Sequence, residues 1–223
     1  MQTRPFCAGD LSKARVLVIG HDPRLQKSGT QAEYALFADY FFKPIPTRKS
    51  ELAKYHLAEA TFGYIGYLTS YKYPADQLVL TNLCNVALPH APTGKTVLIP
   101  EEEAQVGVNA IRDLLGQSNI EIIFVMSMQV NYWLQKLSFY PSITDFLKKA
   151  EPRARGISSK PPYYEPQQSK AFQLICGQCY TSDNRKIVPI LHVKNWPLRG
   201  AFAQAYRVSY ENCINQLKRG DSG

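Results

Sequence analysis

Four polar side chains stand at the end of short apolar segments of the sequence or just beyond them. They are a carboxylate, an amide, a hydroxyl and an imidazole: Asp22, Asn82, Ser127 and His192. Together these groups supply a negative charge, hydrogen-bond donors and acceptors, and a titratable ring, which are the usual components of an active site. We therefore expect the four residues to meet in the folded chain.

Each of the four residue types also has an ordinary structural explanation. An Asp before a Pro commonly starts a turn, Asn and Ser commonly cap helices, and a single His is often a satisfied core residue. All four, however, follow apolar segments in the same way. That coincidence favours an active site over four unrelated structural roles.

The apolar segments predict strands that alternate with helices. The predicted strands are Arg15–Gly20, Gln77–Leu83, Glu121–Ser127, Ala171–Cys176 and Ile187–His192. The predicted helices are Thr30–Phe42, Leu52–Tyr71, Pro100–Leu115, Gln129–Leu137 and Gly200–Lys218. This alternation predicts an α/β fold with three α/β/α layers around a central, mainly parallel sheet of four to five strands. In such sheets ligands bind beyond the carboxyl ends of the strands, where the four polar residues lie.

Length and composition indicate one globular domain, residues 1–223. Of the 223 residues, 45% are hydrophobic and 20% are charged, which excludes a disordered or fibrous protein. The apolar runs are too short to span a bilayer and Met1–Asp10 has no signal-peptide core. We expect no membrane partner and an intracellular location, cytoplasmic if the source is bacterial. The Pro-rich stretch Glu151–Lys170 predicts a long loop inserted into the domain.

The basic residues are distributed unevenly. Lys148–Gly223 contains 13 Lys and Arg against 5 Asp and Glu, whereas Met1–Leu147 contains 13 of each, so the net charge of +8 lies in the last third. A one-sided excess is typical of proteins that bind the phosphate backbone of nucleic acids. It is equally typical of a solvated face that keeps a protein soluble.

The first half of the chain resembles the uracil-DNA glycosylases. Gly20-His21-Asp22-Pro23 is similar to the family's Gly-Gln-Asp-Pro-Tyr-His motif at the end of the first strand. Gln31-Ala32, followed by Phe37, resembles the family's Gln-Ala and its base-stacking Phe. Lys43–Pro46, with Ser50–Leu52 after it, resembles the Pro-rich loop and the helix that follows.

The second half continues the resemblance in the same order. Leu78–Asn82 is similar to the family's Leu-Leu-Leu-Asn strand, whose Asn reads uracil. His192, with Pro197–Phe202 beyond it, resembles the His-Pro-Ser-Pro-Leu segment and the Arg-Gly-Phe-Phe that follows. The resemblance extends over Val16–Leu217 and implies a divergent member of the superfamily.

The resemblance implies an enzyme that removes uracil or a related damaged base from DNA by hydrolysing the N-glycosidic bond of a flipped-out nucleotide. It implies that Asp22 positions the water and stabilises the cationic sugar. It also implies that His192 donates a hydrogen bond to the base oxygen on which negative charge develops. The base-binding residues would be Gly20, His21, Phe37 and Asn82. The amide would pair with the base edge and the ring would stack on its face. No metal and no organic cofactor is implied.

Six further residues are expected to contact DNA, in part because they follow the same motifs: Arg24, Ser127, Lys194, Trp196, Leu198 and Arg199. Lys194 and Arg199 would hold phosphates that flank the base, and Trp196 or Leu198 would fill the space that the base vacates. Trp196 is equally well explained as an anchor between the surface and the core. We expect DNA as the partner and a monomeric protein.

Two departures from the family motifs keep other functions open. Arg24 replaces the Tyr that blocks the thymine methyl group, and Leu25 replaces the following His. The second motif, His192–Pro197, lacks the phosphate-binding Ser. A first alternative is therefore a non-catalytic nucleic-acid-binding relative. A second alternative is a hydrolase of small nucleosides or nucleotides that uses the same crevice.

Two other motifs are better explained without a ligand. Cys176-Gly-Gln-Cys179 has metal-ligand spacing, but the remaining Cys residues supply no second pair, so we interpret it as a pair of small buried residues. An odd total of five Cys fits a reducing compartment. Ala91–Thr96 resembles the end of a phosphate loop, but Pro89 stands where that loop needs a Gly.

Overall fold

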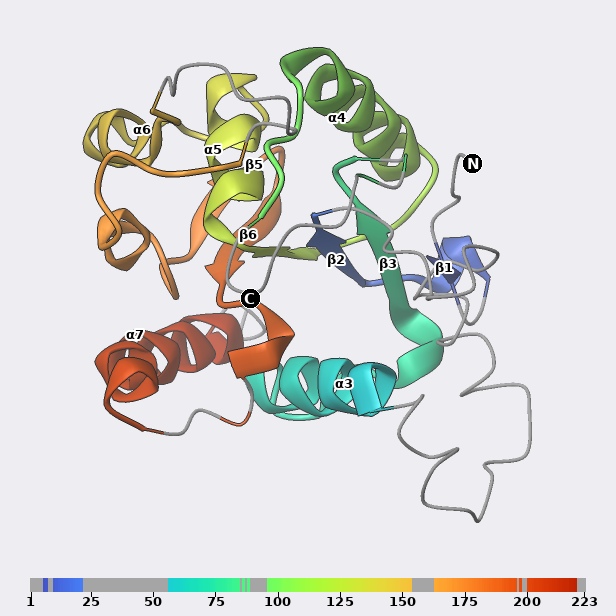
Figure 1. Ribbon diagram of the computed structural model, residues 1–223. Coiled ribbons are helices and arrows are strands. Elements are labelled where there is room, and N and C mark those ends of the chain that lie inside the picture. Colours follow the sequence, from blue (N-terminus) through green and yellow to red (C-terminus); the bar gives the residue numbers. More distant parts are fainter. Residues whose placement is uncertain are drawn as a thin grey trace.

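A computed structural model shows how these segments are arranged (Figure 1). It describes residues 6–7, 10–21, 56–84, 86, 88, 96–153, 163–195, 197 and 200–219. The helix predicted at Thr30–Phe42 lies outside this part of the chain. Within it, no helix is both long and apolar enough to cross a membrane.

The central strands are apolar on both faces. All five residues of β4 (Ile122–Met126) are buried, as are the first four residues of β2 (Val16–Gly20) and of β3 (Leu78–Asn82). Strands of this kind need cover on both faces, which the helices of an α/β fold provide. The α/β class and the mainly parallel sheet predicted from the sequence are confirmed.

Six described strands form one sheet in the order β1-β3-β2-β4-β6-β5. The four central strands, which include β6 (Arg185–Ile190), run parallel to one another. The two edge strands are antiparallel: β1 (Phe6–Cys7) pairs with β3, and β5 (Tyr180–Ser182) forms a hairpin with β6. The sequence predicted four to five strands, because strands of two and three residues are too short to carry a recognisable apolar pattern.

The helices lie on both sides of the sheet. Helices α3 (His56–Leu68) and α7 (Gly200–Arg219) lie below it, and α4 (Glu101–Gly116) and α5 (Met128–Lys136) lie above it (Figure 1). A short helix that the sequence did not predict, α6 (Thr144–Ala150), packs against α5. The 3₁₀ helices of the described chain are η1 (Leu11–Lys13), η2 (Ala75–Gln77), η3 (Ala171–Leu174) and η4 (Val193–Asn195).

One predicted strand is wrong. Ala171–Cys176 forms the 3₁₀ helix η3 and the turn after it. Its buried residues are Ala171, Phe172, Ile175 and Cys176. That spacing follows a helical face and not the alternation of a strand, and periodicity alone does not separate the two in so short a segment. Gly177, with φ of 75°, then turns the chain toward β5.

The described ends of the Pro-rich segment Glu151–Lys170 pack against α6. Pro152 and Pro166 form an isolated β-bridge, and the Tyr164 hydroxyl donates to the carbonyl oxygen of Ala150 at 2.5 Å. The two ends of the predicted insertion are therefore held together next to α6. Residues 154–162 between them lie outside the described chain.

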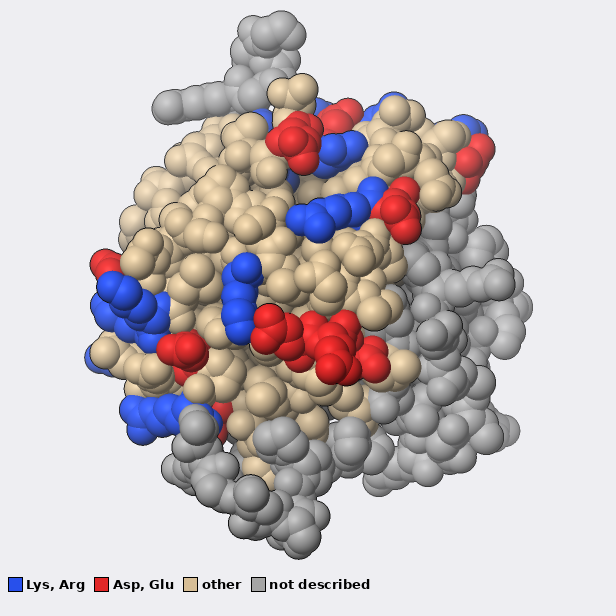
Figure 2. Space-filling view, turned by 90° about the horizontal axis from the view of Figure 1, so that it is seen from above, with Lys and Arg blue, Asp and Glu red and all other residues tan. Residues whose placement is uncertain are grey.

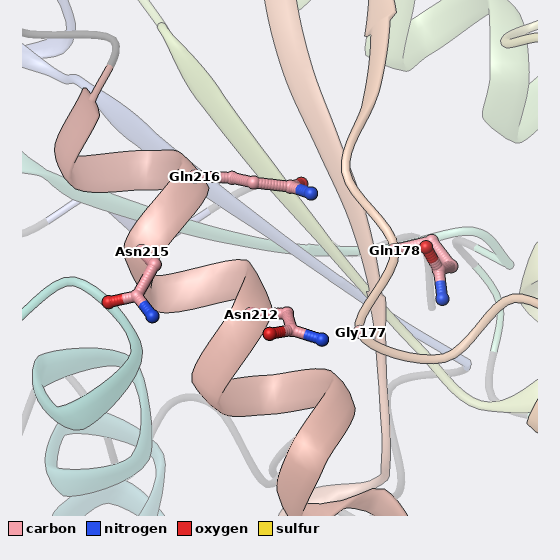
Figure 3. Close-up of a pocket in the computed structure, with 5 residues that line it drawn as sticks. All are labelled: Gly177, Gln178, Asn212, Asn215 and Gln216. Atoms are coloured by element: carbon pink, nitrogen blue, oxygen red, sulfur yellow. The ribbon is translucent and has the colours of Figure 1, made fainter.

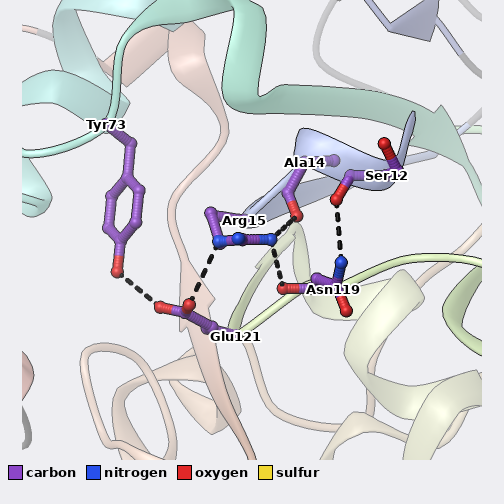
Figure 4. A network of polar contacts seen from close by, with 6 residues as sticks. All are labelled: Ser12, Ala14, Arg15, Tyr73, Asn119 and Glu121. Carbon is purple, nitrogen blue, oxygen red and sulfur yellow. Dashed lines mark hydrogen bonds and ion pairs between the residues drawn. The ribbon is translucent and has the colours of Figure 1, made fainter. Parts of the chain in front are cut away.

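A polar network joins the segments that enter the central strands. Arg15 Nε lies 3.3 Å from Glu121 Oε1, and the Tyr73 hydroxyl donates to Glu121 Oε2 at 3.0 Å (Figure 4). Asn119 Nδ2 donates to the carbonyl oxygen of Ser12 at 2.8 Å. Arg15 leads into β2, Tyr73 precedes β3 and Glu121 precedes β4. The network therefore helps these three strands to start at a common level.

Candidate functional site

The four parallel strands also end side by side. The register places Asn82 of β3 opposite Gly20 of β2, and Met126 of β4 opposite Ile190 of β6. The pairing of β2 with β4 brings these two pairs to the same level. We call this boundary, with the residues directly beyond it, the carboxyl edge. The amide, hydroxyl and imidazole predicted to meet all lie along it.

The side chain of Asn82 lies against the backbone of Gly20. A Cβ atom added to Gly20 would come within 2.4 Å of Asn82 Oδ1, so only glycine leaves the amide in this position. Beyond the strands, the backbone nitrogen of Leu83 donates to the carbonyl oxygen of Gly20, and that of Cys84 donates to the carbonyl oxygen of His21, both at 2.9 Å. These bonds hold the end of β3 against the end of β2. The amide is thereby kept at the carboxyl edge with both a donor and an acceptor.

His21 is held by a buried amide from α5. Gln129 Oε1 accepts a hydrogen bond from the backbone nitrogen of Ile99 at 2.5 Å, and Gln129 Nε2 donates to the carbonyl oxygen of Val97 at 3.0 Å. These contacts define the orientation of the amide, so the other hydrogen on Nε2 is directed to His21 Nε2, 2.6 Å away. His21 Nε2 must accept this bond. We therefore assign the neutral tautomer with its proton on Nδ1.

Ser127 occupies the sharp turn between β4 and α5. Its φ of 73° and ψ of 152° are rarely adopted by residues that carry a side chain. Its hydroxyl oxygen accepts a long hydrogen bond of 3.5 Å from the backbone nitrogen of Val130 and so caps α5. Strained backbone of this kind is concentrated at functional sites. The N-terminus of a helix also favours a negatively charged group.

His192 follows the end of β6 by two residues. Its carbonyl oxygen accepts hydrogen bonds from the backbone nitrogen of Asn195 at 2.9 Å and from Asn195 Nδ2 at 3.2 Å. These bonds close the turn of η4 directly behind the His. The preceding Leu191 is buried, whereas His192 itself is half-buried. His192 is therefore partly exposed, whereas its backbone is fixed by the buried Leu191 before it and by the hydrogen bonds from Asn195 after it.

The strand spacing sets the width of the candidate site. Asn82 ends β3 and His192 follows β6, and these strands are three positions apart in the sheet, which corresponds to about 14 Å across the strand direction. His21 and Ser127 directly follow β2 and β4, the two strands between them. Asn82 and His192 therefore mark the two ends of the candidate site along the carboxyl edge.

Several predicted site residues lie outside the described chain: Asp22, Arg24, Phe37, Trp196, Leu198 and Arg199. Lys194 is described as part of the backbone of η4, next to His192. Asp22 follows His21 directly in the sequence. The described part of the predicted site therefore consists of Gly20, His21 and Asn82, which were predicted to bind the base, with the imidazole of His192 and the hydroxyl of Ser127.

A hollow of about 200 Å³ lies between α7 and the loop at Gly177 and contains none of the predicted site residues. Its polar lining consists of carboxamides: Gln178, Asn212, Asn215 and Gln216. Asn212 and Gln216 extend from α7 toward the loop, whereas Gln178 points away from the helix (Figure 3). The four amides do not converge on one point, so we do not place the active site here.

A larger hollow of about 440 Å³ lies near the start of β4 and β6, opposite the carboxyl edge. Two of its lining residues are Arg112 and Arg185. Arg112 donates to the carbonyl oxygens of Leu137 and Ser138 at 3.3 and 3.2 Å, and Arg185 donates to that of Leu115 at 3.1 Å. Both guanidinium groups thus cap the carboxyl ends of helices, which explains their presence without a ligand.

Three basic residues of the last third take part in local contacts within the fold. Arg185 and Lys186 begin β6, where they donate to carbonyl oxygens in the last turns of α4 and α7 at 3.1 and 3.3 Å. Arg207 lies 3.9 Å from Glu211 along α7. On the face seen from above, basic and acidic side chains are mixed (Figure 2). Lys194, beside His192, is a basic residue at the carboxyl edge.

The Cys176–Cys179 pair lies at the turn between η3 and β5. Cys176 is fully buried, and burial raises the pKa of its thiol to about 12. Cys179 is half-buried. No group of three or more His, Cys, Asp or Glu side chains within the described ranges is placed to hold a metal ion.

Sequence reasoning missed Gln129, which contacts His21. Helix α5 carries three buried amide side chains, Gln129, Asn131 and Gln135. Polar residues of a helix usually face solvent, so the sequence predicts them on the exposed side. The only sign of a buried amide in the sequence is that the polar residues of α5 lie on several sides of the helix.

No family model matches the chain, and a search of the curated proteins finds no match.

The contact between Gln129 and His21 leads to a prediction. Gln129→Met keeps the length of the side chain but leaves the Val97 carbonyl and the Ile99 N–H without their buried partner. We expect a loss of about 2–3 kcal/mol in the free energy of unfolding, measured in urea. Nitrogen NMR shifts of His21 should also show a change from the single Nδ1–H tautomer to a mixture. Gln105→Met, on the surface of α4, is the control and should change stability by less than about 0.5 kcal/mol. An unchanged tautomer in Gln129→Met would contradict the assignment.

Proposed function

We propose that this protein is a DNA glycosylase that removes uracil or a related damaged base from DNA. One observation carries the proposal: Asn82 lies against Gly20 at the carboxyl edge, with His21 next to it and His192 along the same edge. This is the edge at which α/β sheets bind ligands. The order of these residues along the chain is that of the glycosylase motifs they resemble.

In the proposed reaction Asn82 recognises the flipped-out base. A carboxamide offers one acceptor and two donors in a plane, which matches the hydrogen-bonding edge of a pyrimidine or purine. Orientation is essential, because a rotated amide would present the donor where the acceptor is needed. The contact with Gly20 limits this rotation, since Oδ1 is packed against the Gly20 backbone.

Bond cleavage separates charge, and one residue is proposed to stabilise each of the two charges. Asp22 positions the water and stabilises the cationic sugar, and His192 donates a hydrogen bond to the base oxygen that gains negative charge. A preorganised donor is effective here because it needs no movement as the charge develops. Phe37 stacks on the face of the base. Ser127, at the N-terminus of α5, contacts a DNA phosphate, which both its hydroxyl and the helix dipole favour.

A strand-cleavage assay tests the proposal. Oligonucleotides that carry uracil, hypoxanthine, xanthine or a G·T mismatch are incubated with the protein and then treated with alkali, which breaks the strand at abasic sites. We expect cleavage with at least one of them. Asp22→Asn should lower the rate at least about 100-fold while DNA binding persists, because the charge is lost with little change in shape.

The other outcomes distinguish the alternatives. Salt-sensitive retention of the same DNA with no cleavage would indicate a non-catalytic binding protein. Turnover of free nucleosides with weak, salt-insensitive DNA binding would indicate a small-molecule hydrolase. Full activity of Asp22→Asn would rule out the proposed mechanism.

The Gly20–Asn82 contact yields a second prediction. In Gly20→Ala the added Cβ meets only the end of the Asn82 side chain at less than 3.4 Å, so the fold can adapt while the amide is displaced. Unfolding free energy should change by less than about 1 kcal/mol, whereas the rate of base release should fall at least about tenfold. Gly116→Ala, where the added Cβ has no neighbour within 4 Å, is the control and should keep full activity. Normal activity in Gly20→Ala would show that the position of Asn82 does not matter.

A further inference from the structure

A buried group of polar atoms lies behind His192. The hydroxyl oxygens of Tyr64 and Tyr210 are 2.6 Å apart, and the Leu191 N–H donates to the Tyr210 hydroxyl at 2.7 Å. Cys176 Sγ lies 3.5 Å from the same hydroxyl. The three side chains are almost completely buried, with at most 1% of their surface exposed. We call these residues the Tyr210 cluster.

The Tyr210 cluster joins four parts of the fold. Tyr64 belongs to α3 and Tyr210 to α7, the two helices below the sheet (Figure 1). Cys176 lies in the turn after η3, and Leu191 directly follows β6. Burial raises the pKa of both tyrosines and that of the Cys176 thiol, so all three groups stay neutral at physiological pH. They act on Leu191 as hydrogen-bonding dipoles and not as charges.

Tyr210 supplies a hydrogen-bond acceptor at the point where the pairing of β6 with β4 ends. Ile190 is the last residue of β6 paired with β4, and the next N–H, that of Leu191, donates to the Tyr210 hydroxyl instead of to a neighbouring strand. On the other side of His192, Asn195 donates twice to the His192 carbonyl oxygen. The backbone of His192 is therefore held by one hydrogen-bonding residue on each side.

We propose that Tyr210 is a positioning residue for His192. Its hydroxyl fixes the Leu191 amide, and through it the direction in which the imidazole leaves the end of β6. The inference rests on the role proposed above for His192. A displacement of a catalytic group by about 1 Å is enough to lower a rate by about two orders of magnitude, so a single buried hydrogen bond behind the His is sufficient for such a role.

Tyr64 supplies a matched control for Tyr210. Tyr210→Phe and Tyr64→Phe each remove one hydroxyl of the same buried pair, and both break the bond between the two rings. Tyr210→Phe also removes the hydroxyl to which the Leu191 N–H donates at 2.7 Å. A role in stability alone predicts that both variants lose stability, Tyr210→Phe more because it also leaves the Leu191 N–H unpaired, and that His192 is unchanged in both. A positioning role predicts different effects on His192.

The first measurement uses single-turnover kinetics on uracil-containing duplex DNA. Tyr210→Phe should lower the rate of base release about tenfold and leave the dissociation constant for DNA within about twofold of the unsubstituted protein. Tyr64→Phe should keep the rate within about twofold. Equal losses of rate in the two variants, or a loss that appears only in DNA affinity, would overturn the positioning role.

The second measurement does not depend on catalysis. The imidazole NMR signals of His192 should shift in Tyr210→Phe and stay in place in Tyr64→Phe. In the unsubstituted protein, the Leu191 amide should be protected from hydrogen exchange as strongly as the neighbouring amides of β6. The hydrogen-exchange part of this measurement uses the unsubstituted protein alone, so it does not depend on the folding of a variant.

The two measurements separate the failure of each idea. A protein that releases no base but shows the expected His192 shifts would refute the glycosylase proposal and retain the positioning role. An active protein in which Leu191 exchanges freely and Tyr210→Phe leaves His192 unchanged would refute the positioning role alone.

Discussion

The candidate site depends on the in-register parallel pairing of β3, β2, β4 and β6. Because the pairs Gly20–Asn82 and Met126–Ile190 lie level, the chain leaves all four strands at one boundary. Residues far apart in the sequence are therefore brought to one edge by backbone hydrogen bonds and not by contacts among themselves. A slip of one residue in any strand would turn its terminal side chain to the other face of the sheet.

Beyond this boundary, each polar group has its own support from a neighbouring element. Asn82 lies against Gly20, His21 accepts from Gln129 of α5, and the residue before His192 donates to Tyr210 of α7. The supports come from the sheet and from the helix layers on both of its sides. The sheet thus sets where each group lies, and the helices restrict how it is oriented. Supporting contacts of this kind are expected of a preorganised site.

The strands and site residues that depend on neighbouring residues in the sequence could be predicted. Gly20, Asn82 and His192 follow continuous apolar runs, so both their strands and their common edge could be predicted. Gln129 and Tyr210 could not, because the burial of a polar side chain on a helix depends on partners distant in the sequence, here His21 and Leu191. Ala171–Cys176 was assigned to a strand because a short apolar run suits helix and strand equally. The expectations for Asp22 and Phe37 remain predictions, since both residues lie outside the described chain.

The most direct test of a base-binding carboxyl edge is a titration of free uracil and hypoxanthine into the nitrogen-15-labelled protein, followed by NMR. The side-chain amide of Asn82 and the imidazole of His192 should shift together and saturate with one of the two bases, because they face the same ligand. Asn82→Ala should abolish the saturable shift at His192. Shifts confined to the hollow beside α7, or none at either residue with any base, would contradict a base-binding site at this edge.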